Sequence, residues 1–191
     1  MASAACPLCG QNTGSCGEGL RRCAGCGFVS REKKYFGEPV YEGASELEIY
    51  SSGKKDLFDL ALARLGRLFP EKGTLLDIGC AGGEFLKAAA ARGWLAEGLE
   101  IAPDLAGKAA GSGFTVHTKP VESAGLRGEA YCAVTVFEVF SQMENPGVAA
   151  AELFRIVKPG GALYVREFNA SFHLALHRLE LAGLFKPLGA S

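Results

Sequence analysis

The chain has 191 residues, of which 48% are hydrophobic and 21% charged, and its formal net charge is −1. This length and balance suit one α/β domain with a small appendage, and the charge provides no chain-wide attraction for nucleic acid or an anionic membrane. No apolar run approaches the roughly 20 residues that cross a bilayer, and the first residues lack a basic segment followed by an apolar stretch. We therefore expect a cytoplasmic protein without membrane attachment.

Cysteines are concentrated near the start of the chain, where two Cys-x-x-Cys pairs flank a predicted hairpin. The predicted metal ligands are Cys6, Cys9, Cys23 and Cys26. Four thiolates at this spacing are typical of a closed, structural zinc site. Gly10 and Gly27 each follow the second cysteine of a pair, where a knuckle commonly needs a positive φ. We predict a zinc ribbon over residues 1–34, folded by its metal. Reduced cysteines without metal are the alternative, and Cys16 has no predicted role.

The ribbon has a basic edge that could contact a phosphate backbone. Its members are Arg21, Arg22, Arg31, Lys33 and Lys34. The other interpretation is a solvated face around an anionic Zn(Cys)₄ centre, and the near-neutral chain favours it. Nucleic acid is therefore not the expected partner. Residues 35–53 follow as an aromatic and acidic connector.

Residues 54–191 alternate between helical and strand patterns. Helical spacing covers 54–69, 83–92, 103–110 and 148–157. Short apolar runs typical of strands cover 74–78, 95–99, 114–117, 131–137 and 162–167. Strands that alternate with helices of about ten residues imply right-handed crossovers. The expected fold is a Rossmann-like, mostly parallel sheet with helices on both faces.

A glycine-rich turn runs from Asp77 to Gly83, between the first predicted strand and its helix. A dinucleotide fingerprint would place its third glycine at position 84, which is Glu84, so a carboxylate would face the phosphates. The spacing instead fits Asp-x-Gly-x-(Gly/Ala)-x-Gly, a turn suited to a ligand without phosphate. Glu100 ends the second strand, where a carboxylate can accept hydrogen bonds from both ribose hydroxyls.

Residues 75–167, including the Val157–Gly161 segment that matches a Leu-Lys-Pro-Gly-Gly turn, resemble the class I S-adenosylmethionine-dependent methyltransferases. With the ribbon in front, the chain resembles a bacterial subgroup of that class with a paired Cys-x-x-Cys module. The resemblance implies S-adenosylmethionine as cofactor and S-adenosylhomocysteine as product. The implied cofactor-binding residues are Asp77, Gly79, Cys80, Ala81, Gly83, Glu100, Ile101, Val121, Glu122, Phe137 and Glu138.

The resemblance also implies roles within this set. The Asp77–Gly83 turn would surround the methionine part, Glu100 the ribose, and Ile101 the adenine. Val121 and Glu122 would lie at the adenine edge. Phe137 and Glu138 would close the site at the end of the fourth strand.

The sequence departs from the family pattern at two places within this region. Ala81 replaces the middle glycine, which is harmless provided that its φ is negative. Ser141-Gln142 stands where the family often has Glu-His, so the usual general base is missing and Glu138 is the nearest candidate. Alignment of a nucleophile with the sulfonium methyl can itself supply much of the rate.

The C-terminal part is short for the family. The segment 168–191 has a helical leucine pattern, and the last two strands of the family's sheet are missing. Either the chain is a fragment of a longer protein, or its fifth strand is an edge that a second copy covers in a homodimer. His173, His177 and Glu180 could bind a metal, although an exposed helical face is the favoured interpretation. His117 receives no role.

The function that we expect is methyl transfer from S-adenosylmethionine to a small molecule at oxygen, nitrogen or carbon. The alternative is a zinc-ribbon interaction module with a catalytically inactive methyltransferase-like domain. RNA modification guided by the ribbon is a third hypothesis, which the near-neutral charge disfavours.

Overall fold

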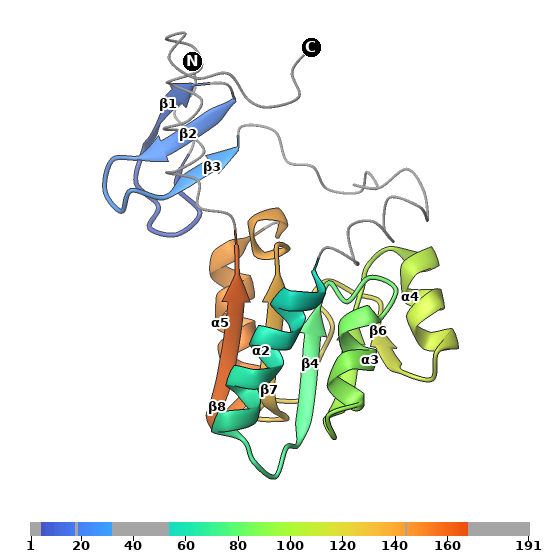
Figure 1. The fold of residues 1–191 in the computed structure, drawn as a ribbon. Helices are drawn as coiled ribbons and strands as arrows, with labels where there is room; N and C mark the ends of the chain where they lie inside the picture. Colours follow the sequence, from blue (N-terminus) through green and yellow to red (C-terminus); the bar gives the residue numbers. More distant parts are fainter. Residues whose placement is uncertain (1–4, 18, 32–53, 144, 168–191) are drawn as a thin grey trace, which may run out of the picture. The chain divides into compact units, whose positions relative to one another are not determined.

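The computed structural model describes residues 5–17, 19–31, 54–143 and 145–167. These residues fall into two compact units, a ribbon and a larger α/β unit, which are described separately (Figure 1). The predicted connector and the predicted last helix lie outside the described residues, and the predicted domain bounds stay predictions. Within the part that is described, no helix is long and apolar enough to cross a membrane.

The ribbon is a three-stranded antiparallel sheet. It consists of β1 (Thr13–Gly17), β2 (Leu20–Cys23) and β3 (Val29–Arg31), in that order. Arg21 of the predicted basic edge donates from Nε to Thr13 Oγ1 at 2.8 Å, across the β1–β2 pair. At least this arginine is therefore used within the ribbon itself.

The larger unit contains a five-stranded sheet of order β6-β5-β4-β7-β8, with every neighbouring pair parallel. Its strands are β4 (Thr74–Ile78), β5 (Leu95–Leu99), β6 (Thr115–His117), β7 (Tyr131–Phe137) and β8 (Val157–Arg166). Its helices are α2 (Lys55–Leu68), α3 (Glu84–Ala90), α4 (Pro103–Gly111) and α5 (Pro146–Ile156), with a 3-10 turn η1 at Phe140–Gln142. The predicted Rossmann-like fold is confirmed.

Helices cover both faces of this sheet because its strands carry apolar side chains on both sides. On one face, Leu65 of α2 and Phe85 of α3 pack against Leu75 of the central strand. On the other, Leu153 and Ile156 of α5 pack in a second cluster that includes Leu76. Each such side chain contributes roughly 1.5–3 kcal/mol by burial. These two cores pack the helices against the central strands of the sheet.

The structure corrects the prediction for residues 157–161. Instead of a turn before a strand at position 162, α5 ends at Ile156 and β8 begins at once with Val157. The pairing with β7 jumps from Tyr131–Val157 to Ala133–Ala162, so the Pro159–Gly161 stretch bulges out of register. Among the described strands β8 is an edge, where a proline without an N–H is tolerated.

Candidate functional site

The order of the strands indicates where a ligand crevice is expected, at the carboxyl ends of the central strands. The chain continues from β4 to β5 on one side and later returns to β7 on the other, so the connections diverge beside β4. Ligands of open α/β sheets bind at such a switch point, outside the carboxyl ends of the strands. Asp77, the glycine-rich turn, Glu100 and Glu138 all lie at these ends. The topology thus brings most of the predicted site residues together at the carboxyl ends of the central strands.

The start of the glycine-rich turn is fixed by β5. The N–H groups of Gly79 and Cys80 both donate to the carbonyl oxygen of Leu99, at 2.7 and 3.1 Å. Gly79 has φ +74°, and a Cβ there would lie 2.4 Å from Val139 Cγ2. Only glycine meets both demands. The turn consequently brings bare backbone to the crevice.

Ala81 is held in the left-handed region, with φ +47°. The condition under which an alanine would be harmless here, a negative φ, is therefore not met. For a residue with a Cβ this conformation costs roughly 1–2 kcal/mol. In it, the Ala81 N–H donates to Glu100 Oε2 at 3.0 Å. No signal in the sequence indicated this bond, because a lone alanine in a glycine-rich turn is compatible with either sign of φ.

Glu100 is 8% exposed, and both of its carboxylate oxygens accept backbone hydrogen bonds. Besides the bond to Ala81, Oε1 accepts from the N–H of Ala102 at 2.9 Å. The neighbouring Ile101 is 55% exposed, so its side chain is available to pack on a ligand. Glu100 therefore joins the turn after β4 to the loop after β5.

Asp77 is a buried carboxyl at the end of the central strand. It accepts a hydrogen bond from Thr135 Oγ1 at 2.7 Å, and both residues are shielded from solvent. Burial raises the pKa of Asp77 from 3.8 to about 7, although the Thr135 bond and the charge of Lys54 oppose the shift. A ligand cation beside this carboxylate would favour the ionised form.

Cys80 lies within the turn, but its side chain points away from open space. A Cβ on Gly98 would lie 2.4 Å from its sulfur, so Cys80 packs closely against β5. Burial raises the pKa of the Cys80 thiol, so the thiol stays protonated at neutral pH. Any contact of Cys80 with a ligand would come from its backbone.

Phe137 and Val121 support the crevice from within the cores. The ring of Phe137 is 4.9 Å from that of Phe85 and 5.3 Å from that of Phe58, both edge-on. Val121 is 3% exposed and belongs to the core on the α5 side. Glu122 beside it is half-buried. Of these predicted residues, Glu122 is the one whose side chain is partly open to solvent.

Glu138 forms ion pairs with two basic side chains, which the sequence did not indicate. Its Oε2 is 2.7 Å from Lys54 Nζ, and its Oε1 pairs with Arg166 Nη1. Glu138 has φ +59°, and its own N–H donates to the carbonyl of Arg166 at 2.8 Å. Lys54 stands at the start of α2 and Arg166 at the end of β8, positions where charged residues usually face solvent. Both carboxylate oxygens of Glu138 are therefore engaged in ion pairs.

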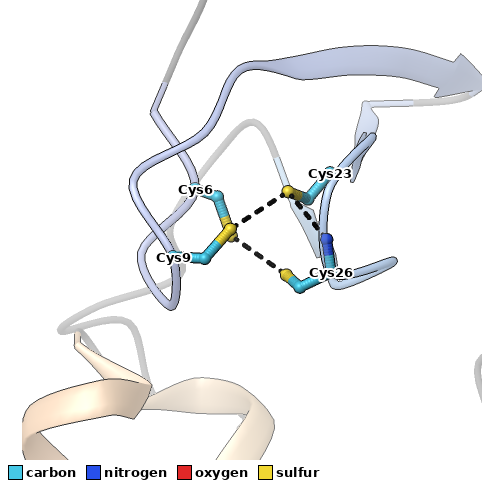
Figure 2. A group of neighbouring side chains, drawn as sticks. All are labelled: Cys6, Cys9, Cys23 and Cys26. Carbon is cyan, nitrogen blue, oxygen red and sulfur yellow. Dashed lines mark hydrogen bonds between the residues drawn. The ribbon is translucent and has the colours of Figure 1, made fainter.

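The second candidate site lies in the ribbon and is drawn in Figure 2. The four cysteine sulfurs lie within 4.8 Å of one another. Cys6 Sγ is 3.6 Å from Cys26 Sγ, and Cys9 Sγ is 3.4 Å from Cys23 Sγ. These separations are far longer than a disulfide and close to the roughly 3.8 Å between thiolates around a tetrahedral zinc ion. The residues present therefore fit a Zn(Cys)₄ site.

The backbone supports this arrangement through two knuckles. The N–H of Leu8 points to Cys6 Sγ at 3.4 Å and the N–H of Cys26 to Cys23 Sγ at 3.5 Å. The N–H of Cys26, with further hydrogen bonds from the Gly25 backbone and the Cys9 side chain, lowers the pKa of Cys23 to about 6, although burial opposes the shift. Gly10 and Gly27 have φ +72° and +75°, which confirms the predicted positive values. Such N–H···S bonds stabilise thiolates as metal ligands.

A polar cluster lies elsewhere on the larger unit. Glu97 Oε2 accepts from Tyr131 O–H at 2.9 Å and lies 3.2 Å from His117 Nε2. These side chains line a hollow of about 360 Å³ beside residues 124–130. Burial and Glu97 raise the pKa of Tyr131. His117 thus has a hydrogen-bonding role within the sheet, while His173 and His177 lie outside the described residues.

Comparison with known proteins identifies the family. Residues 52–189 match the model of the methyltransferase domain family. The chain belongs to this family. The ubiquinone biosynthesis O-methyltransferase of Methylococcus capsulatus is 32% identical over 116 residues, which are 56% of this chain and 48% of that protein. The chain thus spans about half the length of this curated relative.

Two solved methyltransferases share the fold. The S-adenosylmethionine-bound amino pentose methyltransferase from Micromonospora echinaspora has a TM-score of 0.56 and 25% identity, over 69% of this chain and 59% of that one. A sugar N-methyltransferase from Streptoalloteichus has a TM-score of 0.58 and 19% identity, over 71% of this chain and 57% of that one. At its identity, the second shows similarity of fold alone.

Proposed function

We propose that this methyltransferase-family domain binds S-adenosylmethionine at the carboxyl edge of its sheet and transfers the methyl group to a hydroxyl oxygen of a small molecule. The observation that carries the proposal is that two buried carboxylates, Asp77 and Glu100, lie beside the glycine-rich turn at the switch point of the sheet. The spacing of that turn suits a ligand without phosphate. The choice of oxygen rests on the O-methyltransferases among the relatives, two of which are 32% identical to this chain.

Each residue of the crevice suits one part of this cofactor. The buried Asp77 would accept the ammonium group of the methionine part, which would keep the carboxylate ionised. Glu100 retains free lone pairs on both oxygens and would accept the ribose hydroxyls. The exposed Ile101 would pack on the adenine, with Glu122 at its edge. When bound, the cofactor supplies an electrophilic methyl group on a sulfonium.

The protein's contribution to the chemistry would be alignment more than proton transfer. Glu138 is occupied by Lys54 and Arg166, so it is poorly suited to take a proton. An acceptor hydroxyl that is acidic enough to lose its proton to solvent needs no protein base. Proximity of such an oxygen to the methyl group can provide a large share of the rate. We therefore propose a weakly acidic hydroxyl, such as a phenol, as the acceptor.

The same ion-paired Glu138 supports the alternative function. Gln142 takes the place of the usual base and donates from Nε2 to the Glu138 carbonyl at 3.1 Å. A domain arranged in this way could bind the cofactor without transferring its methyl group, and the ribbon would then be an interaction module.

Two measurements separate these functions. Calorimetric titration with S-adenosylhomocysteine tests the site, and a micromolar dissociation constant is expected. Transfer of labelled methyl from S-adenosylmethionine to a panel of phenols, alcohols and amines then tests the chemistry. Binding without transfer to any acceptor would favour the inactive module. Absence of binding would overturn the proposed methyl transfer and leave the inactive module as the remaining function.

We also propose that Cys6, Cys9, Cys23 and Cys26 bind one structural zinc ion. Its support is the sulfur separations, which suit a tetrahedral site, and the two N–H···S knuckles. Four protein ligands leave no position for water, so the ion would hold the ribbon together and perform no catalysis.

We also propose that the chain forms a homodimer through β8. β8 is an edge among the described strands, and its Leu163 and Val165 are 44% and 45% exposed. Pairing with a second copy would cover these side chains and the backbone groups along the open side of the strand. Sedimentation at micromolar concentration should give twice the 20.0 kDa mass of one chain. A single species at the mass of one chain would reject the dimer.

A further inference from the structure

Glu100 connects two backbone segments that come from different strands. Its Oε2 accepts from the N–H of Ala81, in the turn after β4, and its Oε1 accepts from the N–H of Ala102, before α4. The side chain is almost fully buried. Hydrogen bonds to an ionised carboxylate are about twice as strong as those between neutral groups. Glu100 is thus well placed to fix the shape of both segments.

The two bonded residues differ in conformation. Ala81 has φ +47°, in the region where a Cβ is unfavourable, whereas Ala102 has φ −78° and is unstrained. A glycine would adopt the Ala81 conformation without cost, but the chain has alanine here. Some interaction must therefore hold Ala81 in place, and the bond from its own N–H to Glu100 is the direct candidate.

The rest of the turn has separate supports. Gly79 and Cys80 donate to Leu99, and Gly83 donates to the carbonyl of Cys80 at 2.9 Å. None of these bonds involves the Glu100 side chain. A change of Glu100 would therefore leave both ends of the turn anchored and release mainly its middle.

We propose that Glu100 is a positioning residue, which keeps Ala81 left-handed and so shapes the backbone that meets the cofactor. This role rests on the proposed function and adds to the direct contact with ribose. Loss of Glu100 would then weaken cofactor binding by two routes. One route is the lost contact, and the other is relaxation of Ala81 into a conformation that no longer fits.

A double-mutant cycle separates the two routes, because glycine at position 81 keeps the left-handed conformation without help. S-adenosylhomocysteine affinity is measured for the unsubstituted protein, Glu100→Gln, Ala81→Gly and the double variant. Glu100→Gln should weaken binding about tenfold or more when Ala81 is present. In the Ala81→Gly background, the loss of affinity caused by Glu100→Gln should be at least threefold smaller. Equal losses in both backgrounds would mean that Glu100 acts on the ligand alone and would overturn the proposal.

Ala102→Gly is the matched control. Ala102 also donates to Glu100 but has a negative φ, so glycine there should not reduce the loss caused by Glu100→Gln. A reduction equal to that from Ala81→Gly would point to general loosening and count against the proposal. If Glu100→Gln does not fold, Glu100→Asp, which retains the charge on a shorter side chain, replaces it in the same cycle.

Hydrogen exchange of the Ala81 amide in ligand-free protein provides a readout that needs no cofactor. Glu100→Gln should speed this exchange at least tenfold, while the Gly79 and Cys80 amides change little. Unchanged protection of Ala81 would overturn the positioning role. If the unsubstituted protein fails to bind S-adenosylhomocysteine but shows the exchange effect, the proposed function fails and the positioning role of Glu100 on the turn stands.

Discussion

Lys54 Nζ lies 2.7 Å from Glu138 Oε2, and both side chains are almost fully withdrawn from solvent. The pair joins the start of α2 to the end of β7, next to the crevice that holds Asp77. Arg166 at the end of β8 pairs with the other oxygen of Glu138. One carboxylate thereby ties together three elements that are distant in sequence. A buried charge that loses a partner is costly, so this network should make a measurable contribution to stability.

Lys54→Met tests the contribution of this network. The substitution keeps the length of the side chain but removes one of the two cations beside Glu138. We expect the free energy of unfolding to fall by about 2–3 kcal/mol, less than for a buried carboxylate left with no cation. Urea denaturation measures the change.

Arg92→Met is the matched control for Lys54→Met. Arg92 pairs with Asp59 at 2.6 Å, but both side chains are 42% exposed. Exposed pairs contribute roughly 0–1 kcal/mol, so this variant should lose well under half as much stability. Equal losses in the two variants would show that burial gives the Lys54 pair no special weight.

Asp77 should make stability depend on pH. Its pKa is about 7 in the folded protein and 3.8 when exposed. Because the unfolded chain releases this proton at lower pH, the free energy of unfolding should fall as pH rises from about 4 to about 7, and then level off. Asp77→Asn removes this dependence and should be more stable than the unsubstituted protein at pH 8, but not at pH 4. Urea denaturation of both proteins at pH 4 and at pH 8 measures the free energy of unfolding. An equal gain in stability at the two pH values would contradict the raised pKa.

Ala81→Gly should stabilise the ligand-free protein. Glycine relieves the left-handed strain but adds freedom to the unfolded chain, so the net gain should be about 0.5–1 kcal/mol. Ala89→Gly, in the buried face of α3, is the opposite control and should destabilise by about 1 kcal/mol or more. Thermal melts of the two variants measure these effects. A loss of stability on Ala81→Gly would mean that the φ of +47° carries no strain.

The fold, and the position of the candidate site at the ends of its strands, were predictable from the sequence because both depend on local patterns. Alternating strands and helices indicated the parallel sheet, which the structure confirms. The spacing of Asp77, Gly79 and Gly83 predicted a ligand turn, and its role in binding stays a prediction. Parallel strands have their carboxyl ends on the same side of the sheet, so the acidic residue that ends the second strand, Glu100, was expected beside the turn. The place of Glu138 in the site was implied by the resemblance to the methyltransferases, and not by periodicity or spacing.

Features that depend on tertiary contacts could not be predicted in this way. Lys54 begins a helix beside Lys55, a pattern typical of solvent-exposed charge, and only packing shows that Glu138 is its partner. The sign of φ at Ala81 depends on a carboxylate that is distant in sequence. The Lys-Pro-Gly-Gly segment is typical of a turn, yet it becomes a bulged part of β8 because it lies at an edge. A contact distant in sequence overrides the local preference at Lys54 and at Ala81, whereas at the Lys-Pro-Gly-Gly segment the position in the sheet does so.

Zinc removal should unfold the ribbon. The described ribbon residues bury few apolar side chains besides Cys6 and Cys23, so we expect the proposed metal to supply most of the ribbon's folding free energy. We expect about one equivalent of zinc per chain in protein purified without added metal. Cys23→Ser should reduce the zinc content to below about a tenth of an equivalent, because a three-thiolate site is open and weaker.

Cys16→Ser changes a cysteine outside the cluster and should retain the metal, which makes it the matched control. Metal analysis of the three proteins after dialysis measures the content, and circular dichroism after treatment with a chelator follows the loss of the ribbon's strands. Full zinc content in Cys23→Ser, or equal loss in Cys16→Ser, would reject the four-cysteine site.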